Sequence, residues 1–276
     1  MYKRQVEKTL RAHKIDAVIH FAAYKAVGES VEKPLEYYNN NVGGLISLLN
    51  AMKKVGVEKL VFSSSCTVYG QPKKLPVTEK SPVVKAESPY GNTKKVCEEM
   101  LQDISKTSKG KTISLRYFNP VGAHPTSLIG ELPLGIPNNL VPFITQTAAG
   151  WRNQLTVFGT DYNTPDGTCL RDYIHVVDLA LAHVTALEYL DKMSESYDTF
   201  NLGTGTGSSV LEVIKAFEEA SGQKLNYKLG ERRAGDVEQV WADCSKANKL
   251  LGWKTKIDLK QMMLDAWNWQ VILKKD

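Results

Sequence analysis

Apolar stretches alternate with amphipathic ones through the first part of this chain. The stretches 15–23, 59–65 and 112–118 are rich in apolar residues and short, which is typical of strands buried on both faces of a parallel sheet. Amphipathic stretches with helical periodicity lie between them, over about 34–55 and 90–105. Strands that alternate with helices at these intervals predict an α/β fold with a doubly wound parallel sheet.

The pattern changes after residue 118. Residues 119–170 contain many Pro, Gly and Asn residues, which is more typical of a lobe that lines a ligand than of a repeated sheet unit. Another helix is predicted to begin within 172–180. We therefore expect a sheet domain over 1–118 and, over 119–276, mainly a smaller C-terminal substrate-binding lobe with some segments that return to the sheet.

Composition narrows the function classes. The 276 residues include 35 Lys and Arg, 30 Asp and Glu, and 42% hydrophobic residues, an ordinary globular balance that excludes disordered, collagen-like and coiled-coil chains. No block of Lys and Arg stands out, so we expect no nucleic-acid partner. No apolar stretch approaches the roughly 18 residues of a membrane span, and the charged N-terminus shows no signal peptide.

The cysteines and histidines are scattered. Cys66, Cys97, Cys169 and Cys244 form no CxxC pair, a pattern that favours reduced thiols and a cytoplasmic location. The five histidines show no zinc-ligand spacing, so we expect no metal.

A glycine cluster at 203–207 follows one predicted strand and precedes a helix. Its spacing is GxGxG, and Ser208 stands where a third glycine could close a phosphate-binding turn. We favour a tight turn into a helix over a phosphate cradle.

The residues with the clearest chemical meaning are Tyr90 and Lys94. They stand four apart at the start of a predicted helix and therefore lie on the same side of it. A nearby ammonium lowers the pKa of a phenol from about 10, so that the phenolate can accept a proton from a substrate hydroxyl. Ser65, at the end of a buried strand, could hold that hydroxyl. A YxxxK pair alone often marks only a solvated helix face, but the serine-tipped strand upstream favours the catalytic interpretation.

Several motifs together resemble one known family. They are His20-Phe-Ala-Ala-Tyr-Lys25, Ser63-Ser-Ser65-Cys-Thr67-Val-Tyr-Gly70, Ser88-Pro-Tyr90-Gly-Asn-Thr-Lys94, Arg116-Tyr-Phe-Asn119, Gly135-Ile-Pro-Asn-Asn139-Leu, Arg171-Asp-Tyr-Ile-His and Arg232-Arg233-Ala-Gly-Asp236. In this order, from about residue 15 to 269, the chain resembles the UDP-glucose 4-epimerases (UDP-galactose 4-epimerases) of the extended short-chain dehydrogenase/reductase superfamily. The resemblance implies a Rossmann-like sheet, with residues 1–118 as the remainder of an NAD-binding domain.

The resemblance also implies roles for individual residues. Tyr90 is the implied proton acceptor, with Lys94 and Ser65 as its catalytic partners. The implied cofactor-binding residues are Phe21, Ala22, Lys25, Asn40, Tyr90, Lys94, Tyr117 and Phe118. The implied substrate-binding residues are Ser65, Cys66, Thr67, Asn119, Asn138, Asn139, Leu140, Thr156, Val157, Phe158, Arg171, Arg233, Asp236 and Val240.

Structural alternatives remain open for some of these residues. Asn119 could cap a turn, Arg171 could pair with Asp172 or Asp178, and Phe21 could belong to the core. His175, which the implied chemistry does not need, is interpreted as structural.

The implied reaction is the NAD-dependent interconversion of UDP-glucose and UDP-galactose in galactose metabolism, through a 4-keto sugar that turns about its diphosphate. The stretch 65–68 lacks the acidic pair that a 4,6-dehydratase needs. Two positions depart from the family or refine its specificity: Ala234 stands where epimerases usually carry Glu, and the small Val240 suggests that UDP-N-acetylhexosamines also fit.

One expected segment is missing from the sequence. Family members begin with a strand and a GxxGxxG turn that binds the pyrophosphate, and at about 30 residues per βαβ unit roughly 60 residues are absent. We expect an exposed sheet edge, and a chain that neither retains NAD nor turns over substrate. Residues 1–5 do not resemble the family and could be a sequencing-library scar, or simply polar helix-forming residues.

Three hypotheses for the function follow. The favoured one is an epimerase, which by resemblance is a homodimer. The second is another nucleotide-sugar enzyme of the superfamily, such as a decarboxylase or reductase. The third is a non-catalytic short form that binds nucleotide sugars.

Overall fold

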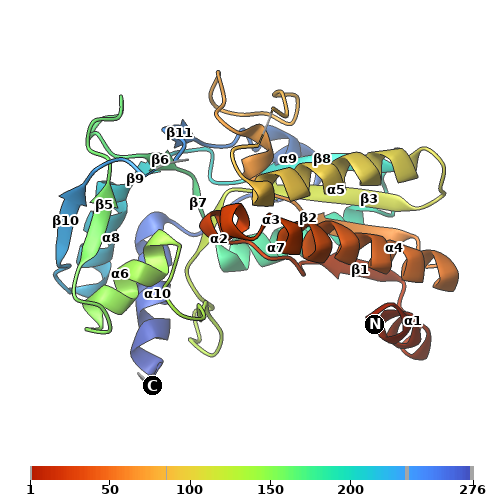
Figure 1. Ribbon diagram of the computed structural model, residues 1–276, viewed down its shortest axis with the longest axis horizontal. Helices are drawn as coiled ribbons and strands as arrows, with labels where there is room; N and C mark the ends of the chain where they lie inside the picture. The colour runs from red at the N-terminus through yellow and green to blue at the C-terminus, as the bar shows by residue number, and fades with distance from the viewer. Residues whose placement is uncertain (1, 85, 234–235, 274–276) are drawn as a thin grey trace.

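The computed structural model describes residues 2–84, 86–233 and 236–273. Two lobes lie next to each other along the long axis of the molecule, and the N-terminus belongs to the larger one (Figure 1). Short strands and loops connect the lobes in the middle of the view, and the site described below lies there.

The larger lobe is built on the parallel sheet that the sequence predicts. Its strand order is β1-β2-β3-β8, with β1 at Ala17–His20, β2 at Lys59–Ser63, β3 at Lys111–Tyr117 and β8 at Tyr197–Leu202. All neighbouring pairs are parallel, with Leu60 opposite Val18 and Phe200 opposite Leu115. Because β8 comes from the second half of the sequence, residues beyond 118 complete this sheet.

Helices cover both faces of the sheet (Figure 1). On one face lie α4 (Gly44–Val55) and α5 (Pro89–Ser105), and α1 (Tyr2–Ala12) packs on α4. On the other face lie α7 (Val176–Tyr189) and α9 (Ser245–Leu250). The side chains of Val61, Ile113, Leu115, Phe200 and Leu202 are fully buried in the resulting core, so the apolar runs over 59–65 and 112–118 do become two-sided buried strands. The run over 15–23 does not: it forms β1, which lies at the edge of the sheet and is only half-buried.

The predicted helix over 34–55 is divided into three parts. It consists of α3 (Pro34–Tyr37), a π-helical segment (Tyr38–Gly43) and α4, and it follows α2 (Val27–Glu32). Helix α4 ends where Gly56 adopts φ +85°, a left-handed conformation that glycine adopts without steric cost.

The smaller lobe has its own core. Strands β5 (Leu155–Phe158) and β10 (Tyr227–Gly230) pair in parallel, and Ile144, Phe217 and Met263 are buried beside them. Its helices are α6 (Leu140–Ala148), α8 (Val210–Ser221) and α10 (Leu259–Ile272). The connecting elements are η2 (Cys66–Tyr69), β4 (Asn119–Val121), β6 (Leu170–Arg171), β7 (Tyr173–His175), β9 (Ser208–Ser209) and β11 (Gln239–Val240).

Helix α7 begins within the predicted range, but a strand that the sequence did not predict precedes it. Residues 173–175 form strand β7, which pairs with β4, and the helix starts only at Val176. His175 Nδ1 accepts the Val177 N–H at 3.0 Å and so caps the helix, while its Nε2 lies 3.2 Å from Asp265. This fully buried histidine joins α7 to α10, which agrees with a structural role.

The glycine cluster at 203–207 holds a protein carboxylate. The backbone N–H groups of Thr204 and Gly205 donate to Asp172 at 2.7 and 3.1 Å, and Ala242 N–H donates to the same carboxylate at 3.1 Å. The buried Asp172 therefore occupies the place that a phosphate takes in a nucleotide-binding loop. The interpretation as a structural turn is supported by these contacts.

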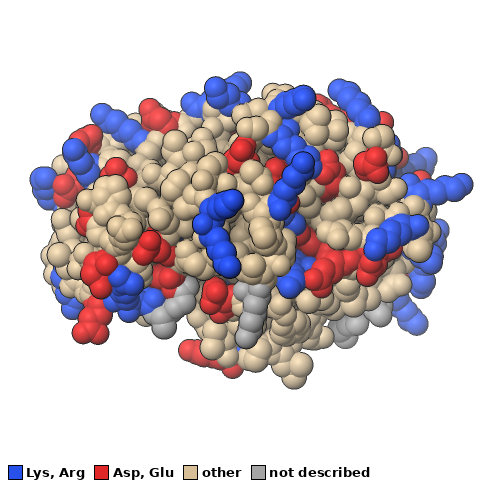
Figure 2. Space-filling view, turned by 90° about the horizontal axis from the view of Figure 1, so that it is seen from above, with Lys and Arg blue, Asp and Glu red and all other residues tan. Residues whose placement is uncertain are grey.

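Within the described ranges, no helix is long and apolar enough to cross a membrane, and no cluster of His, Cys, Asp and Glu could hold a metal ion. On the face shown in Figure 2, Lys and Arg are spread among Asp and Glu rather than gathered in one basic patch.

Candidate active site

Helix α5 carries both Tyr90 and Lys94 to the end of strand β2. The helix begins where the Ser88 hydroxyl accepts the Gly91 N–H at 3.2 Å and Pro89 fixes the first turn. One turn later the Lys94 side chain is buried, and its Nζ donates to the Ser63 carbonyl at 2.6 Å. Burial lowers the pKa of Lys94 to about 8, against the opposing charges of Cys97 and Glu98.

Tyr90 and Ser65 are brought together. Burial raises the pKa of the Tyr90 phenol, and a hydrogen bond with the Ser65 side chain opposes this rise. Ser65 also accepts the Thr67 N–H at 3.2 Å and caps the short helix η2. The strand-tip serine and the helix-start tyrosine thus form a pair, whereas the hydrogen bond of Lys94 goes to Ser63. The prediction that the Lys94 ammonium lowers the pKa of Tyr90 is therefore not met here: burial raises that pKa, and Lys94 is not among the groups that shift it.

Two cavities lie near this pair: Tyr90, Ser65 and Lys94 line neither of them, but Cys66, Thr67 and Ser88 line the larger one. One has a volume of about 430 Å³ and the other of about 840 Å³. They share six lining residues, so they form adjoining halves of one cleft. The shared residues are Asn119, Asn138, Asn139, Arg171, Arg233 and Asp236.

The boundary between the halves is rich in positive charge. Arg233 Nη2 donates to Asp236 Oδ1 at 2.8 Å, and Arg171 Nη2 lies 3.9 Å from the same oxygen. Arg171 also donates to the Leu170 carbonyl at 2.9 Å and pairs with neither Asp172 nor Asp178 in the described chain. Two guanidinium groups facing one carboxylate leave a net positive charge, which suits a diphosphate.

The smaller cavity is mainly apolar. Besides the shared residues, its walls include the predicted substrate-binding residues Leu140, Thr156, Val157 and Phe158. Apolar walls together with the amide side chains of Asn119, Asn138 and Asn139 fit a nucleobase and its ribose.

The larger cavity adjoins the catalytic helix start. It is lined by Cys66, Thr67 and Val240 among the predicted residues, together with Ser88. The Thr67 Oγ1 atom is buried and has no hydrogen-bond partner among the described residues. A buried hydroxyl without a partner is costly, so this atom is suited to a polar ligand such as a sugar. Burial raises the pKa of Cys66 to about 12, which keeps its thiol neutral.

The predicted cofactor residues are less closely assembled. The Phe21 side chain is 54% exposed and packs on His183 with ring centroids 4.5 Å apart, so it is not a core residue. Ala22 is exposed and Lys25 pairs with Glu131 at 2.9 Å. Asn40 donates to Asn41 at 3.0 Å.

The neighbouring residues Tyr117 and Phe118 have different surroundings. The Tyr117 hydroxyl contacts Ser63 Oγ. Phe118, in contrast, is buried with Val68 and Tyr69 and lines neither cavity. Its predicted contact with a nicotinamide therefore has no support in this packing. Asn119 lies in β4 and lines both cavities rather than only capping a turn.

Sequence reasoning missed three residues near the site. Glu131 lines the larger cavity and accepts from both Lys25 and Asn139. Glu98 and Arg116 form a buried ion pair behind the catalytic groups. An arginine inside the apolar strand 112–118 could have signalled a buried carboxylate partner, because a charge is rarely buried unpaired. Ala234, the departure from the family pattern, lies outside the described residues.

The fold and the cleft define a class of protein: a nucleotide-sugar enzyme of the extended short-chain dehydrogenase/reductase superfamily. Residues 2–266 match the family model described as GDP-mannose 4,6 dehydratase. UDP-glucose 4-epimerase 2 of Arabidopsis thaliana is 56% identical over 265 residues, which cover 96% of this chain and 75% of the relative. The UDP-glucose 4-epimerase of Drosophila melanogaster is 54% identical over 270 residues, covering 97% and 77%.

Solved structures agree with these relatives. The epimerase from Stenotrophomonas maltophila, crystallised with NAD and formylated UDP-arabinopyranose, has a TM-score of 0.95 and 50% identity, covering 98% of this chain and 80% of that one. The epimerase from Bifidobacterium longum, in complex with NAD+ and UDP, has a TM-score of 0.93 and 48% identity, covering 98% and 80%. This chain belongs to the UDP-glucose 4-epimerase family.

Proposed function

We propose that this site interconverts UDP-glucose and UDP-galactose by NAD-dependent epimerisation at C4, as a step of galactose metabolism. The observation that carries the proposal is a cleft whose larger half is lined by Cys66, Thr67 and Ser88, the near neighbours of Ser65 and Tyr90 in the sequence, while Arg171 and Arg233 mark its boundary with the smaller half. This arrangement offers a proton acceptor at one end of a UDP-sugar and a diphosphate site at its middle.

The residues present fit the nicotinamide end of NAD. Lys94 Nζ uses one of its three donors on Ser63, so two remain for ribose hydroxyls. The exposed Phe21 and Ala22 lie just beyond the end of β1, where parallel-sheet proteins bind nucleotides. When bound, NAD accepts a hydride from the sugar and returns it.

The protein groups perform the remaining steps. In its ionised form, Tyr90 accepts the proton of the sugar 4-hydroxyl, which Ser65 holds in place. The positive charge of NAD, when bound, would oppose the rise that burial causes in the pKa of Tyr90. Arg171 and Arg233 keep the diphosphate fixed while the 4-keto sugar turns, and the larger cavity of about 840 Å³ provides room for that rotation. Tyr90 then returns the proton to the epimerised hydroxyl. The lack of a carboxylate within 65–68 argues against dehydration.

We further propose that the chain as given neither retains NAD nor turns over substrate. The 276 residues contain no GxxGxxG turn for the pyrophosphate. We expect UDP-galactose to remain unchanged with this chain, and UDP-glucose to form with a chimaera that carries the N-terminal segment of a family member. Tyr90→Phe in the chimaera should lower kcat by about 10²- to 10⁴-fold, the usual contribution of a general base.

Binding without catalysis is a second candidate, because both halves of the substrate cleft are complete while that turn is lacking. Calorimetry separates the two candidates. If UDP-galactose binds the 276-residue chain and its Tyr90→Phe variant equally well, and the chimaera remains inactive, the binding-only function replaces the epimerase proposal. If no UDP-sugar binds the 276-residue chain, the binding-only function fails; if the chimaera is inactive as well, the epimerase proposal also fails.

We also propose that UDP-N-acetylhexosamines fit the site. Val240 is 6% exposed and lines the larger cavity, so its small side chain leaves room there. Val240→Tyr should fill this space and weaken UDP-N-acetylglucosamine binding at least tenfold, with UDP-glucose binding little changed. Equal losses for both ligands, or no binding of the N-acetyl sugar to the unmodified chain, would contradict the proposal.

Two properties of the whole protein are proposals of the same kind. We propose a homodimer, from the family resemblance, and light scattering at several concentrations tests it. We propose a cytoplasmic location, because the four cysteines are all free thiols. Fluorescent tagging in cells checks the location.

A further inference from the structure

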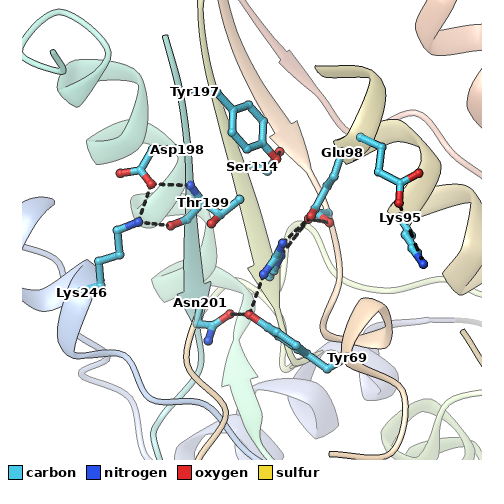
Figure 3. A network of polar contacts seen from close by, with 12 residues as sticks. Tyr69, Lys95, Glu98, Ser114, Tyr197, Asp198, Thr199, Asn201 and Lys246 are labelled. Carbon is cyan, nitrogen blue, oxygen red and sulfur yellow. Dashed lines mark hydrogen bonds and ion pairs between the residues drawn. The ribbon is translucent and has the colours of Figure 1, made fainter. Parts of the chain in front are cut away.

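A buried polar network lies directly behind the catalytic groups. The Arg116 guanidinium, on β3, donates from Nε to Glu98 Oε1 at 2.9 Å and from Nη2 to Oε2 at 2.5 Å, and both side chains are at most 4% exposed. Arg116 Nη1 donates to the Tyr69 hydroxyl at 2.9 Å, and that hydroxyl donates to Asn201 Oδ1 at 2.6 Å (Figure 3). Asn201 belongs to β8, so the network joins the neighbouring strands β3 and β8.

All branches of the network except the one through Asn201 on β8 end on a segment that carries a site residue. Glu98 stands one turn after Lys94 on helix α5, which also carries Tyr90. Ser64, which donates to Glu98 Oε1, directly precedes Ser65. Tyr69 is the last residue of η2, whose Cys66 and Thr67 line the larger cavity. The pair Arg116–Glu98 is therefore the common attachment of the helix start, the serine tip and the cavity turn.

The Arg116–Glu98 pair also leaves the Lys94 ammonium available to Ser63. A carboxylate one turn from Lys94 would otherwise attract its ammonium, which the site needs beside Ser63. Burial lowers the pKa of Arg116, but the hydrogen bonds and charge of Glu98 outweigh this and raise it, so the guanidinium stays charged. The paired Glu98 is then satisfied by two partners, Arg116 and Ser64, without Lys94.

We propose that Glu98, Arg116, Tyr69 and Asn201 are positioning residues. They fix the η2 turn against helix α5, so that the sugar-facing groups of the turn and the Tyr90–Ser65 pair keep their relative positions. This inference rests on the proposed function only for the identity of the ligand; the positioning of the turn is a property of the protein alone.

Tyr69→Phe is the sharpest test. It removes the hydroxyl that joins η2 to Arg116 and Asn201 but keeps the buried ring, whereas Arg116→Ala would leave a buried carboxylate unpaired and could prevent folding. The matched control is Tyr197→Phe. The Tyr197 hydroxyl donates to Ser114 at 2.9 Å in the same sheet (Figure 3). Its side chain packs against helix α5, as the network does, but among the described residues it makes no hydrogen bond to η2, so this variant leaves the turn attached.

The first readout needs no ligand. The Cys66 thiol lies on the turn itself, and its alkylation rate can be followed by peptide mass analysis separately from the other three cysteines. Tyr69→Phe should raise this rate about three- to tenfold, the effect expected when a net hydrogen-bond contribution of about 0.5–1.5 kcal/mol no longer holds the turn closed. Tyr197→Phe should leave it within twofold. Equal rates in the two variants would overturn the positioning role.

The second readout separates sugar from nucleotide. Tyr69→Phe should weaken UDP-galactose binding about three- to tenfold but leave UDP binding unchanged, because UDP contacts the smaller cavity and the arginines. Equal losses for the two ligands would mean a general destabilisation and would contradict the proposal. If neither ligand binds the unmodified chain or the chimaera, the proposed function fails while the Cys66 measurement still decides the positioning role.

Discussion

The two sides of the site differ in how much of their surroundings this chain supplies. On the substrate side, residues from η2, β4, β5 and the loops around 138 and 233 enclose the cleft, and Arg171 and Asp236 are each only 16% exposed. On the cofactor side, Phe21 is 54% exposed and Ala22 is exposed, while Lys25, 66% exposed in its pair with Glu131, also lines the larger cavity. Neighbouring elements hold Arg171 and Asp236 on the substrate side, whereas Arg233, Asn138 and Asn139 there are exposed.

The two sides should therefore respond differently to substitution. Recognition of the nucleotide sugar depends on contacts made within the 276 residues, so it should respond strongly to single substitutions in the cleft. The cofactor side contributes the buried Lys94 and an open surface beyond β1. Substitutions there should affect folding stability and its pH dependence before they affect UDP-sugar binding.

The largest effect should come from the substrate side. Arg171→Ala removes a mostly buried guanidinium at the boundary of the two cavities. We expect UDP to bind about 10- to 100-fold more weakly, since hydrogen bonds to charged groups contribute about 1.5–3 kcal/mol. Calorimetry with UDP measures the loss.

A neighbouring arginine provides the control for this prediction. Arg232 pairs with Asp161 at 2.7 Å, stacks over Tyr162, and lines neither cavity. Arg232→Ala removes the same charge from the same region and should change the affinity for UDP less than threefold. Comparable losses in the two variants would show that general positive charge, rather than the built boundary site, attracts the nucleotide.

Much of the sheet lobe could be predicted because its signals are local. The buried strands over 59–65 and 112–118 and the helix at 90–105 each have a continuous pattern, and the structure confirms all three within a few residues. The three-residue strand 173–175 was missed, because its partner β4 lies more than 50 residues away and the helix that follows dominates the pattern. A three-residue strand that pairs with a distant segment has no recognisable pattern in the local sequence.

In the site, too, local motifs predict nearby residues but not partners that are distant in the sequence. The motif around Tyr90 predicts the helix start and its neighbour Ser65, since both belong to short segments of fixed geometry. Tyr117 and Phe118 were assigned to one ligand, but neighbouring residues in extended chain point to opposite sides. One of them had to be buried, and it is Phe118. The partner of Arg116 could not be named, because several carboxylates were available in the sequence and only the fold selects Glu98.

A smaller effect is expected on the cofactor side, from Lys94→Met. Burial lowers the pKa of Lys94 from 10.5 to about 8, so holding its ammonium in the folded protein at neutral pH has a cost in stability. Each pKa unit corresponds to about 1.4 kcal/mol, and the lost hydrogen bond to Ser63 offsets part of the gain. We expect the variant to be more stable than the unmodified chain by about 2 kcal/mol at pH 7, measured by urea unfolding.

The pH dependence identifies the cause of that gain. Because the folded pKa lies below the unfolded one, the folded protein binds fewer protons than the unfolded chain between about pH 8 and 10.5. The unfolding free energy of the unmodified chain therefore gains a contribution from Lys94 as the pH rises through this window, and the advantage of Met should disappear by about pH 10.5. An advantage that stays constant from pH 7 to 10.5 would mean that better packing of Met, rather than removal of a buried charge, stabilises the variant. Burial of the Lys94 ammonium would then not reduce the folding stability. The difference between the substrate side and a cofactor side that destabilises the folded chain would lose its main support.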